Sequence, residues 1–365
     1  TARPNPNPIC PRKKVNLILG LLVGMFAGVG VAFVRESGVT SMESYTELED
    51  ATGWGALASV PRIVRIPAGP LGIDGEDGLD ARRTRAIKRH HISVLEPNGA
   101  ATEAIRMLRT NLKFRGIGER MKTVLVTSSG PNDGKSTVVT NLAYAFATTG
   151  QRVLLVDGDV RRPDLHTVFG LQSGRGLQEL IRETRLEDPA PNGQPDGTPQ
   201  DVERLLAFAR RSREEGAYPS PPPLPPPPRP AASPRAHVPL ARFVHRTRVE
   251  NLEVLPAGTA EEGTQNALAT RTGELHAILT QAARDYDVVL IDTPPLALVH
   301  DTAVLSSLVN GVLFVVNSRH YDRELLVRSQ STLQRAGANV IGAILNQVEP
   351  TGVYKSSQYY YSEKD

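Results

Sequence analysis

The residues with the clearest chemical signal form a glycine-containing loop. Residues 128–137 read SSGPNDGKST, between an apolar segment and a segment of helical character. In a loop that joins a strand to a helix, backbone amides turn inward and bind phosphate at the helix N-terminus. Lys135 would place a positive charge on the outer phosphates, Ser136 would offer a hydroxyl to Mg²⁺, and Gly134 would allow close backbone approach. Ser129 stands where the usual pattern has its first glycine. We predict a phosphate-binding P-loop; a chance Gly-Lys-Ser turn is the alternative.

Three aspartates follow two further apolar segments. Asp292 ends the segment DVVLID. Asp157 ends the segment VLLVD, and Asp159 follows it by two residues. A carboxylate at such a strand end can hold Mg²⁺ through water, and open α/β sheets bind ligands at this edge. One of Asp157 and Asp159 could steer the metal while the other orients or deprotonates an incoming hydroxyl, and the sequence leaves open which does which. Acidic turn residues without a function are the alternative.

Strand-like and helix-like segments alternate from about residue 100 onward. Residues 100–114 have apolar side chains at helical spacing, which predicts a helix. Further helices are expected from the loop to about residue 148 and over about 265–284. The apolar segments that predict strands are 123–128, 152–157, 252–257, 287–292, 311–317 and 339–346. Because strands that are apolar throughout must be covered on both sides, we predict an α/β fold with a mostly parallel sheet and helices on both faces.

The N-terminal part contains an uncharged stretch of membrane-helix length. Residues 15–34 can span the roughly 30 Å hydrocarbon core as a helix. A signal peptide or a buried core helix is the alternative. Arg12, Lys13 and Lys14 before this stretch favour a cytoplasmic N-terminus, but the predicted nucleotide domain follows the helix and ATP is cytoplasmic. We give more weight to the nucleotide argument. Since the chain begins with Thr1, we expect it to be a fragment with further segments upstream.

Several other features of the sequence limit which functions are possible. Residues 35–98 have the composition of a linker with one short element around 45–51, and His90–His91 within it are expected to be solvated. Residues 183–248 lack hydrophobic periodicity and include a proline-dense stretch at 219–230. A surface insertion or a ligand for an aromatic groove would fit this stretch. The single cysteine excludes an internal disulfide, and a net charge of +3 gives no sign of a nucleic-acid partner.

The C-terminal tail is rich in tyrosine. Four of the nine tyrosines lie among its last twelve residues, in a polar setting, namely Tyr354, Tyr359, Tyr360 and Tyr361. A buried core cannot explain tyrosines in such a terminal segment. The tail could be a site of tyrosine modification, and a chance aromatic tail or a docking segment is the alternative.

Three motifs in this order carry a family resemblance: the loop at 128–137, Asp157-x-Asp159-x-Arg161, and LIDTPP at 290–295. The set resembles the deviant-Walker P-loop ATPases, and within them the bacterial tyrosine kinases (BY-kinases) of capsule and exopolysaccharide export. The segment LEVLPAG at 252–258 also fits that family, whereas the long proline-rich insertion is not typical of it.

The resemblance implies an ATP- and Mg²⁺-dependent tyrosine autokinase that regulates polysaccharide polymerisation and export. Its implied catalytic residues are Lys135, Asp157, Asp159 and Asp292, and its metal site Ser136, Asp157 and Asp292. The implied ATP-binding residues are Gly130, Pro131, Asn132, Asp133, Gly134, Lys135, Ser136, Thr137 and, at the adenine, Asn346. The motif Glu103-x-x-Arg106-x-x-Arg109 is similar to the family's oligomerisation motif, and the tyrosine tail to its autophosphorylation cluster.

The same resemblance implies partners and a location. We expect a ring-shaped homo-oligomer on the inner membrane with a cytoplasmic catalytic domain, acting with polysaccharide machinery and a cognate tyrosine phosphatase. Two alternatives remain: a partition or septum-positioning ATPase, and a non-catalytic nucleotide-gated scaffold for polysaccharide assembly. The expected domains are a Pro-rich extracytoplasmic segment (1–14), a transmembrane helix (15–34), a juxtamembrane linker (35–98), a kinase domain (99–182 and 249–350), a disordered insertion (183–248) and a tyrosine-rich tail (351–365).

Overall fold

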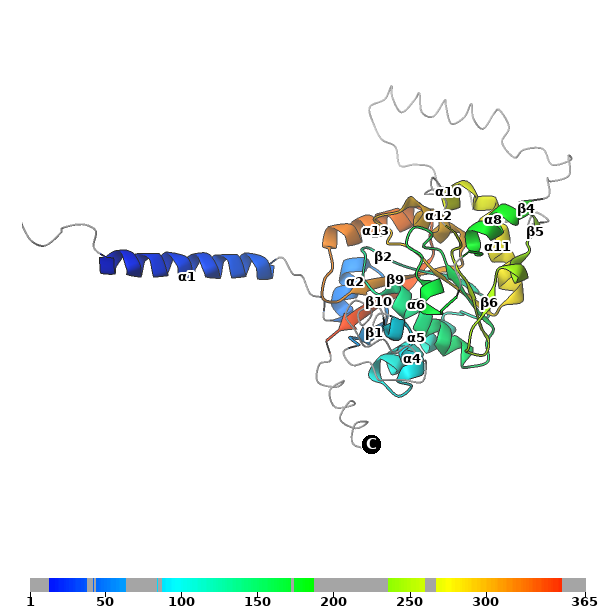
Figure 1. The fold of residues 1–365 in the computed structure, drawn as a ribbon, viewed down its shortest axis with the longest axis horizontal. Helices are drawn as coiled ribbons and strands as arrows, with labels where there is room; N and C mark the ends of the chain where they lie inside the picture. Colours follow the sequence, from blue (N-terminus) through cyan, green and yellow to red (C-terminus); the bar gives the residue numbers. More distant parts are fainter. Residues whose placement is uncertain are drawn as a thin grey trace, which may run out of the picture.

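The central element of the fold is an eight-stranded sheet (Figure 1). The computed structural model describes residues 13–37, 42, 44–63, 84, 87–171, 174–186, 236–259 and 267–349. The strands follow the order β1-β10-β9-β2-β8-β3-β7-β6, and all neighbours are parallel except β6 and β7. Their bounds are β1 Ala56–Pro61, β2 Thr123–Ser128, β3 Val153–Asp157, β6 His245–Arg246, β7 Leu252–Leu255, β8 Val288–Asp292, β9 Gly311–Asn317 and β10 Val340–Val348. The predicted mostly parallel α/β sheet is therefore confirmed.

Helices cover both faces of this sheet. On one face lie α4 (Ile92–Leu95), α5 (Ala100–Phe114), α6 (Lys135–Ala147) and α7 (Leu165–Val168). On the other lie α2 (Tyr45–Thr52), α8 (Leu177–Glu183), α10 (Ala267–Thr270), α11 (Thr272–Asp285), α12 (His300–Leu308) and α13 (Arg323–Arg335). The domain also contains a short 3₁₀ turn, η1 (Leu240–Arg242), and a two-stranded pair, β4 (Arg185–Leu186) with β5 (Ala236–His237).

The strand residues alternate between two core layers. In β2, Val124 and Val126 pack with α5 and α6, whereas Leu125 faces the layer of α11 and α12. In α5 the predicted apolar positions Ala104, Ile105, Leu108 and Leu112 are all buried. This two-sided burial explains why the strands are apolar at successive positions instead of alternating with polar residues.

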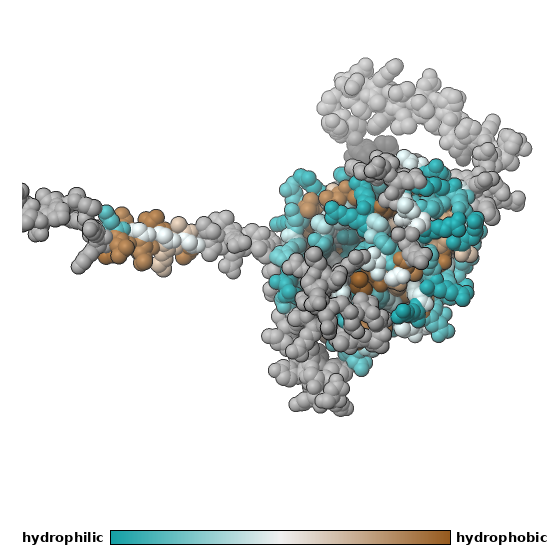
Figure 2. All heavy atoms as spheres, viewed as in Figure 1, coloured by the Kyte–Doolittle hydropathy of each residue, from teal (hydrophilic) through white to brown (hydrophobic). Residues whose placement is uncertain are grey.

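Helix α1 (Lys13–Ser37) contains the uncharged stretch of residues 15–34, so the predicted helix is present. Its described apolar side chains are exposed, among them Leu17, Leu21 and Phe26, and Figure 2 shows this part of the chain as mainly hydrophobic. Among the residues that the structure describes, no helix reaches both the length and the apolar content that crossing a membrane requires. The membrane span therefore stays a prediction.

The predicted linker over 35–98 is too wide, because part of it belongs to the folded domain. Helix α2 is confirmed where one short element was expected, and the Ser44 hydroxyl accepts a hydrogen bond from the Glu47 amide at its N-terminus. Strand β1 pairs with β10 as the outermost strand of the sheet. Met42 is buried in the core and its amide donates to Ser318 O at 2.7 Å. A truncation that starts near residue 80 would remove all of these contacts.

The predicted insertion over 183–248 is also too wide at its C-terminal end. Residues 187–235, with the proline-dense stretch, lie outside the described residues, but 236–248 form packed elements. Leu240 and Phe243 belong to the hydrophobic core, and β6 adds an antiparallel edge to β7. The apolar residues of this segment are few and follow neither helical nor strand spacing, so the sequence pattern could not reveal this packing.

We expect Phe243→Ala to destabilise the protein by about 3–5 kcal/mol, because it removes a fully buried aromatic side chain from the core. Chemical unfolding followed by circular dichroism measures this change. Phe114→Ala is the matched control: Phe114 is 86% exposed and its removal should change stability by less than about 0.5 kcal/mol. Equal effects of the two substitutions would show that residues 236–248 do not contribute to the core.

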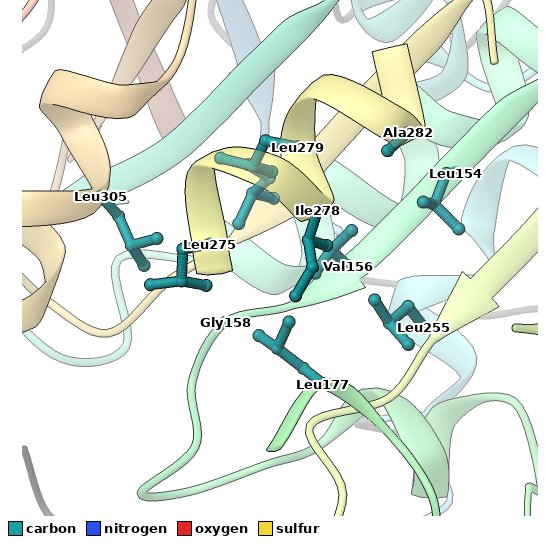
Figure 3. Close-up of a pocket in the computed structure, with 11 residues that line it drawn as sticks. Leu154, Val156, Gly158, Leu177, Leu255, Leu275, Ile278, Leu279, Ala282 and Leu305 are labelled. Carbon is teal, nitrogen blue, oxygen red and sulfur yellow. The ribbon is translucent and has the colours of Figure 1, made fainter. Parts of the chain in front are cut away.

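A small cavity lies near the carboxyl ends of the strands, lined by residues of β3, β7, β8, α8, α11 and α12 (Figure 3). Its volume is about 10 Å³, and its lining, which includes Leu154, Leu255 and Ile278, is apolar. This volume accommodates one water at most, and a water would find no polar partner there. The cavity is therefore a packing gap and not a ligand site.

Candidate functional site

The predicted P-loop joins β2 to α6 at the carboxyl edge of the sheet. β2 ends at Ser128 and α6 begins at Lys135, as the sequence predicts for a strand–loop–helix unit. Gly134 caps α6 with a φ of 89°, a left-handed conformation that favours glycine. A Cβ at this position would lie only 2.1 Å from Asn346 Nδ2, so any other residue here would also displace the Asn346 side chain. The loop conformation thus depends on the glycine that the motif supplies.

The three predicted aspartates lie beside this loop. β3 and β8 are neighbours, and their register pairs Asp157 with Asp292. The Gly158 amide donates to Asp292 O at 2.8 Å, and a Cβ on Gly158 would lie 2.7 Å from the same oxygen. The close approach of the two strand ends therefore requires a glycine between Asp157 and Asp159. The structure brings these three carboxylates and Lys135 together at one edge.

Lys135 is a buried cation within this group of acids. Its side chain is largely enclosed, and Nζ donates to Ser128 Oγ at 3.2 Å. Burial lowers the pKa of Lys135, while the nearby carboxylates of Asp292, Asp133 and Asp159 oppose that change. A desolvated ammonium held in place this way attracts phosphate oxygens more strongly than an exposed lysine would.

Asp292 offers an unused ligand atom. Its Oδ1 is buried and makes no hydrogen bond, while the Ser136 hydroxyl bonds to the carboxylate. Burial raises the pKa of Asp292 to about 7, and the Ser136 bond and Lys135 limit the rise. A buried carboxylate oxygen that makes no hydrogen bond lowers the stability of the protein unless a cation or a hydrogen-bond donor binds to it. Carboxylate and hydroxyl oxygens are the donors that Mg²⁺ prefers, so the residues present fit that metal.

The protein atoms alone do not form a full metal cage. Among the described residues, no group of three or more His, Cys, Asp or Glu side chains has the geometry to hold a metal ion. Mg²⁺ usually keeps several waters and binds through one or two carboxylates together with substrate phosphates. The pair Ser136–Asp292 therefore suits a metal that arrives with a phosphorylated ligand.

Asp157 is held by two backbone amides. Its Oδ1 accepts from the Asp159 amide and its Oδ2 from the Leu165 amide, both at 3.2 Å. Burial and then the charge of Asp292 raise the pKa of Asp157 well above its usual value. Asp159 is less buried, and its Oδ1 accepts from the Arg162 amide at 3.0 Å. The two acids thus differ, with Asp157 fixed inside the protein and Asp159 closer to solvent.

Contacts at the end of β10 reach the P-loop backbone, and the motif alone did not predict them. Asn346 Nδ2 donates to Asp133 O at 2.8 Å and Gln347 Nε2 donates to Asn132 O at 3.2 Å. The Asp133 carboxylate accepts from the Gly130 amide at 2.9 Å within the loop. Asn346 therefore lies against the P-loop. Its expected contact with the adenine of ATP stays a prediction.

The predicted oligomerisation motif is divided between two environments. Glu103 and Arg106 form the expected i, i+3 ion pair, with 3.3 Å between Arg106 Nη1 and Glu103 Oε2. Arg109 instead turns toward α6, where its Nη1 donates to Ala145 O at 3.0 Å. Arg109 Nε is buried and makes no hydrogen bond. The Glu103–Arg106 pair thus lies at the surface, with side chains 66% and 43% exposed, whereas Arg109 turns inward toward α6.

His90 and His91 are buried, so the expectation that they are solvated is wrong. His91 contacts Tyr144 of α6 and Val168 of α7. Periodicity could not reveal this, because the pair precedes a single-turn helix in a polar segment. The predicted phosphorylation sites Tyr354, Tyr359, Tyr360 and Tyr361 lie outside the described residues.

The chain is similar to known proteins in sequence and in fold. The chain is 27% identical over 288 residues to "Tyrosine-protein kinase YwqD" of Bacillus subtilis (strain 168), covering 79% of this chain and 97% of the relative. It is 26% identical over 357 residues to "Tyrosine-protein kinase etk" of Escherichia coli (strain K12), covering 98% of this chain but only 41% of that protein. The solved kinase domain of Escherichia coli tyrosine kinase ETK matches with a TM-score of 0.57 and 22% identity over 84% of this chain and 94% of that one.

The structural match supports the fold, and the two curated relatives are tyrosine-protein kinases. A family model, described as "CobQ/CobB/MinD/ParA nucleotide binding domain", matches residues 124–363, which include the P-loop and all three aspartates. The chain therefore belongs to the CobQ/CobB/MinD/ParA nucleotide-binding domain family.

Proposed function

We propose that the protein is an ATP-dependent protein-tyrosine autokinase that regulates capsular or exopolysaccharide polymerisation and export. The observation that carries this proposal is the buried Lys135 at the end of the P-loop, close to the carboxylates of Asp292, Asp133 and Asp159. One oxygen of Asp292 is buried and makes no hydrogen bond. The names of the relatives support the kinase activity. The relation to capsule systems follows from the resemblance described for the sequence motifs.

The site residues would divide the reaction among them. The P-loop amides and Lys135 bind the β- and γ-phosphates of ATP, which neutralises charge as the phosphoryl group moves. Ser136 and Asp292 would hold Mg²⁺, which supplies further charge neutralisation when bound. Asp157 or Asp159 orients the tyrosine hydroxyl and accepts its proton as oxygen attacks the γ-phosphorus and the bond to ADP breaks. Most of the rate gain would come from positioning and electrostatics.

The other parts of the chain would set the location and assembly. Residues 15–34 would anchor the protein in the inner membrane, with the domain from β1 to β10 in the cytoplasm. Glu103 and Arg106 would contact a neighbouring copy in a ring, so that one copy phosphorylates the tail of the next. Phosphate adds nearly two negative charges per tyrosine, and the resulting repulsion would weaken the ring.

Replacing the four tail tyrosines (354, 359, 360 and 361) by phenylalanine should remove most phosphotyrosine. The full chain in detergent is incubated with Mg·ATP, and mass spectrometry locates the phosphate. We expect at least a tenfold loss of signal, because phenylalanine has no hydroxyl to attack the γ-phosphate. Tyr45→Phe, at an exposed position on α2, is the matched control and should keep the signal. Unchanged phosphorylation of the four-Phe variant would place the acceptor elsewhere.

The family match also includes proteins of the MinD and ParA type, so the same incubation tests the rival functions. ATP hydrolysis without phosphotyrosine in the wild-type protein would favour a partition or septum-positioning ATPase. Nucleotide binding with neither hydrolysis nor transfer would favour a nucleotide-gated scaffold. Each of these outcomes would replace the kinase assignment.

A further inference from the structure

A short segment that leads into the first turn of α4, residues 89–93, contacts elements from both sides of the candidate site. On one side it contacts α6, the helix that begins at the P-loop: Asn141 Oδ1 accepts from the Ser93 amide at 2.9 Å, and Asn141 Nδ2 donates to Arg89 O at 3.1 Å. Asn141 Nδ2 also donates to Thr137 O at 2.8 Å. On the other side, His91 reaches α7. The segment is therefore fixed between the P-loop helix and the helix that follows Asp157.

The hydrogen bonds of His91 define its role in this segment. Nε2 lies 2.9 Å from Val168 O, and because a carbonyl can only accept, Nε2 must carry the proton and donate it. Nδ1 is then an acceptor and receives the Tyr144 hydroxyl. Burial lowers the pKa of His91, which agrees with a neutral ring. The ring also packs edge-on against Phe169, with 5.6 Å between ring centroids. Both nitrogens are used, so an apolar residue of similar size could fill the space but not replace the bonds.

Helix α7 links His91 to Asp157. The helix has four residues, so its first and last residues lie within a single turn of each other. Its last residue, Val168, accepts the His91 bond, and its first residue, Leu165, donates its amide to Asp157 Oδ2. Leu165 is fully buried, which leaves α7 little freedom to adjust. A shift of the Val168 end would therefore displace the amide that orients the Asp157 carboxylate.

We infer that His91 is a positioning residue for Asp157, acting through α7, with the Tyr144 hydroxyl fixing its ring. The inference rests on the proposed function, in which Asp157 acts on the metal or on the attacking hydroxyl. It also gives residues 89–93 a role: they hold the P-loop helix and the Asp157 side of the site at a fixed separation.

The test is a double-mutant cycle between His91 and Asp157 in the full chain. We expect His91→Phe to lower kcat for tyrosine phosphorylation about tenfold, comparable to one buried hydrogen bond left unmade, with the KM for ATP changed less than about twofold. His91→Gln, whose amide can still donate to Val168 O, should recover most of the activity. In an Asp157→Asn background, His91→Phe should lower the residual rate by less than about twofold. His276→Phe, at an exposed position on α11, is the matched control.

Other results would overturn the inference. A merely structural histidine would give the same loss in both backgrounds, no rescue by glutamine, or a higher KM with unchanged kcat. If His91→Phe does not fold, Tyr144→Phe replaces it in the cycle, because it removes only the bond to Nδ1. We then expect a two- to threefold loss that is absent in the Asp157→Asn background, and a loss that persists there contradicts the inference.

Failure of the proposed function would be visible separately. If the wild-type chain transfers no phosphate to tyrosine, the kinase assignment fails. The double-mutant cycle is then repeated with another readout, the Mg²⁺ concentration that gives half-maximal binding of a fluorescent ATP analogue. His91→Phe should raise that concentration in the wild-type background and leave it unchanged when Asp157 is already Asn. An equal shift in both backgrounds would reject the role of His91 independently of the kinase activity.

Discussion

Replacing Lys135 by methionine lowers tyrosine phosphorylation by about 10²–10³-fold, the range expected when a preorganised charge at the reacting phosphate is lost. Methionine has a similar length and fills the same buried space, so the domain should remain folded. The carboxylates of Asp133, Asp159 and Asp292 would then face the phosphates without a compensating cation. Initial rates of phosphotyrosine formation at saturating Mg·ATP measure the effect.

The control for this substitution is Lys113→Met on the exposed side of α5, which should keep full activity. The Lys135→Met chain also tests transfer between copies. Mixed with active chains whose four tail tyrosines are phenylalanine, it should become phosphorylated on its own tail. A Lys135→Met protein that phosphorylates itself at the wild-type rate would contradict the proposed role of Lys135.

Asp292→Asn should raise the stability of the protein at alkaline pH and lower its activity. The pKa of Asp292 in the folded protein is about 7, whereas an unfolded aspartate titrates near about 4. The folded state therefore holds this proton more tightly, and the stability that results is complete below about pH 4 and is lost as the pH rises through about 7. Asparagine does not ionise, so without Mg²⁺ and nucleotide the variant should melt several degrees above wild type at pH 8.

The same variant should lose about 10²-fold in phosphorylation rate, because the buried oxygen that would hold Mg²⁺ is gone. Thermal melts between pH 4 and pH 8 and rate measurements at saturating Mg²⁺ test both parts. Asp50→Asn on the exposed face of α2 is the matched control and should change neither quantity. A melting temperature for Asp292→Asn that follows wild type across this pH range would show that Asp292 does not ionise with a raised pKa.

Much of the fold could be predicted from the sequence because its strands are buried on both faces. The apolar segments at β2, β3, β7, β8, β9 and β10 were long enough to be read as strands, within a few residues at their ends. The glycine-containing loop then placed Lys135 at a helix start, and the strand ends placed Asp157 and Asp292 at the same edge. Parallel strands bring their carboxyl ends together, so motif order alone was sufficient for this part of the site.

The missed parts depend on tertiary contacts of short segments. Strand β1 lies at the edge of the sheet, where six residues ending in Pro61 give little periodic signal. Met42 is a single buried residue in a polar stretch of sequence, and Phe243 lies in a segment too short to show a period. His91 is buried because α6 and α7 enclose it. The turn of Arg109 toward Ala145 likewise depends on how α5 packs on α6. Local pattern carries no information on such contacts.

The most direct test of this account is a crystal structure of the protein with Mg²⁺ and a non-hydrolysable ATP analogue. The account predicts the triphosphate at the P-loop, with Lys135 Nζ moved from Ser128 Oγ to the outer phosphates and the metal at Ser136 on the side of Asp292. A nucleotide bound elsewhere, with Lys135 still bonded to Ser128, would contradict it.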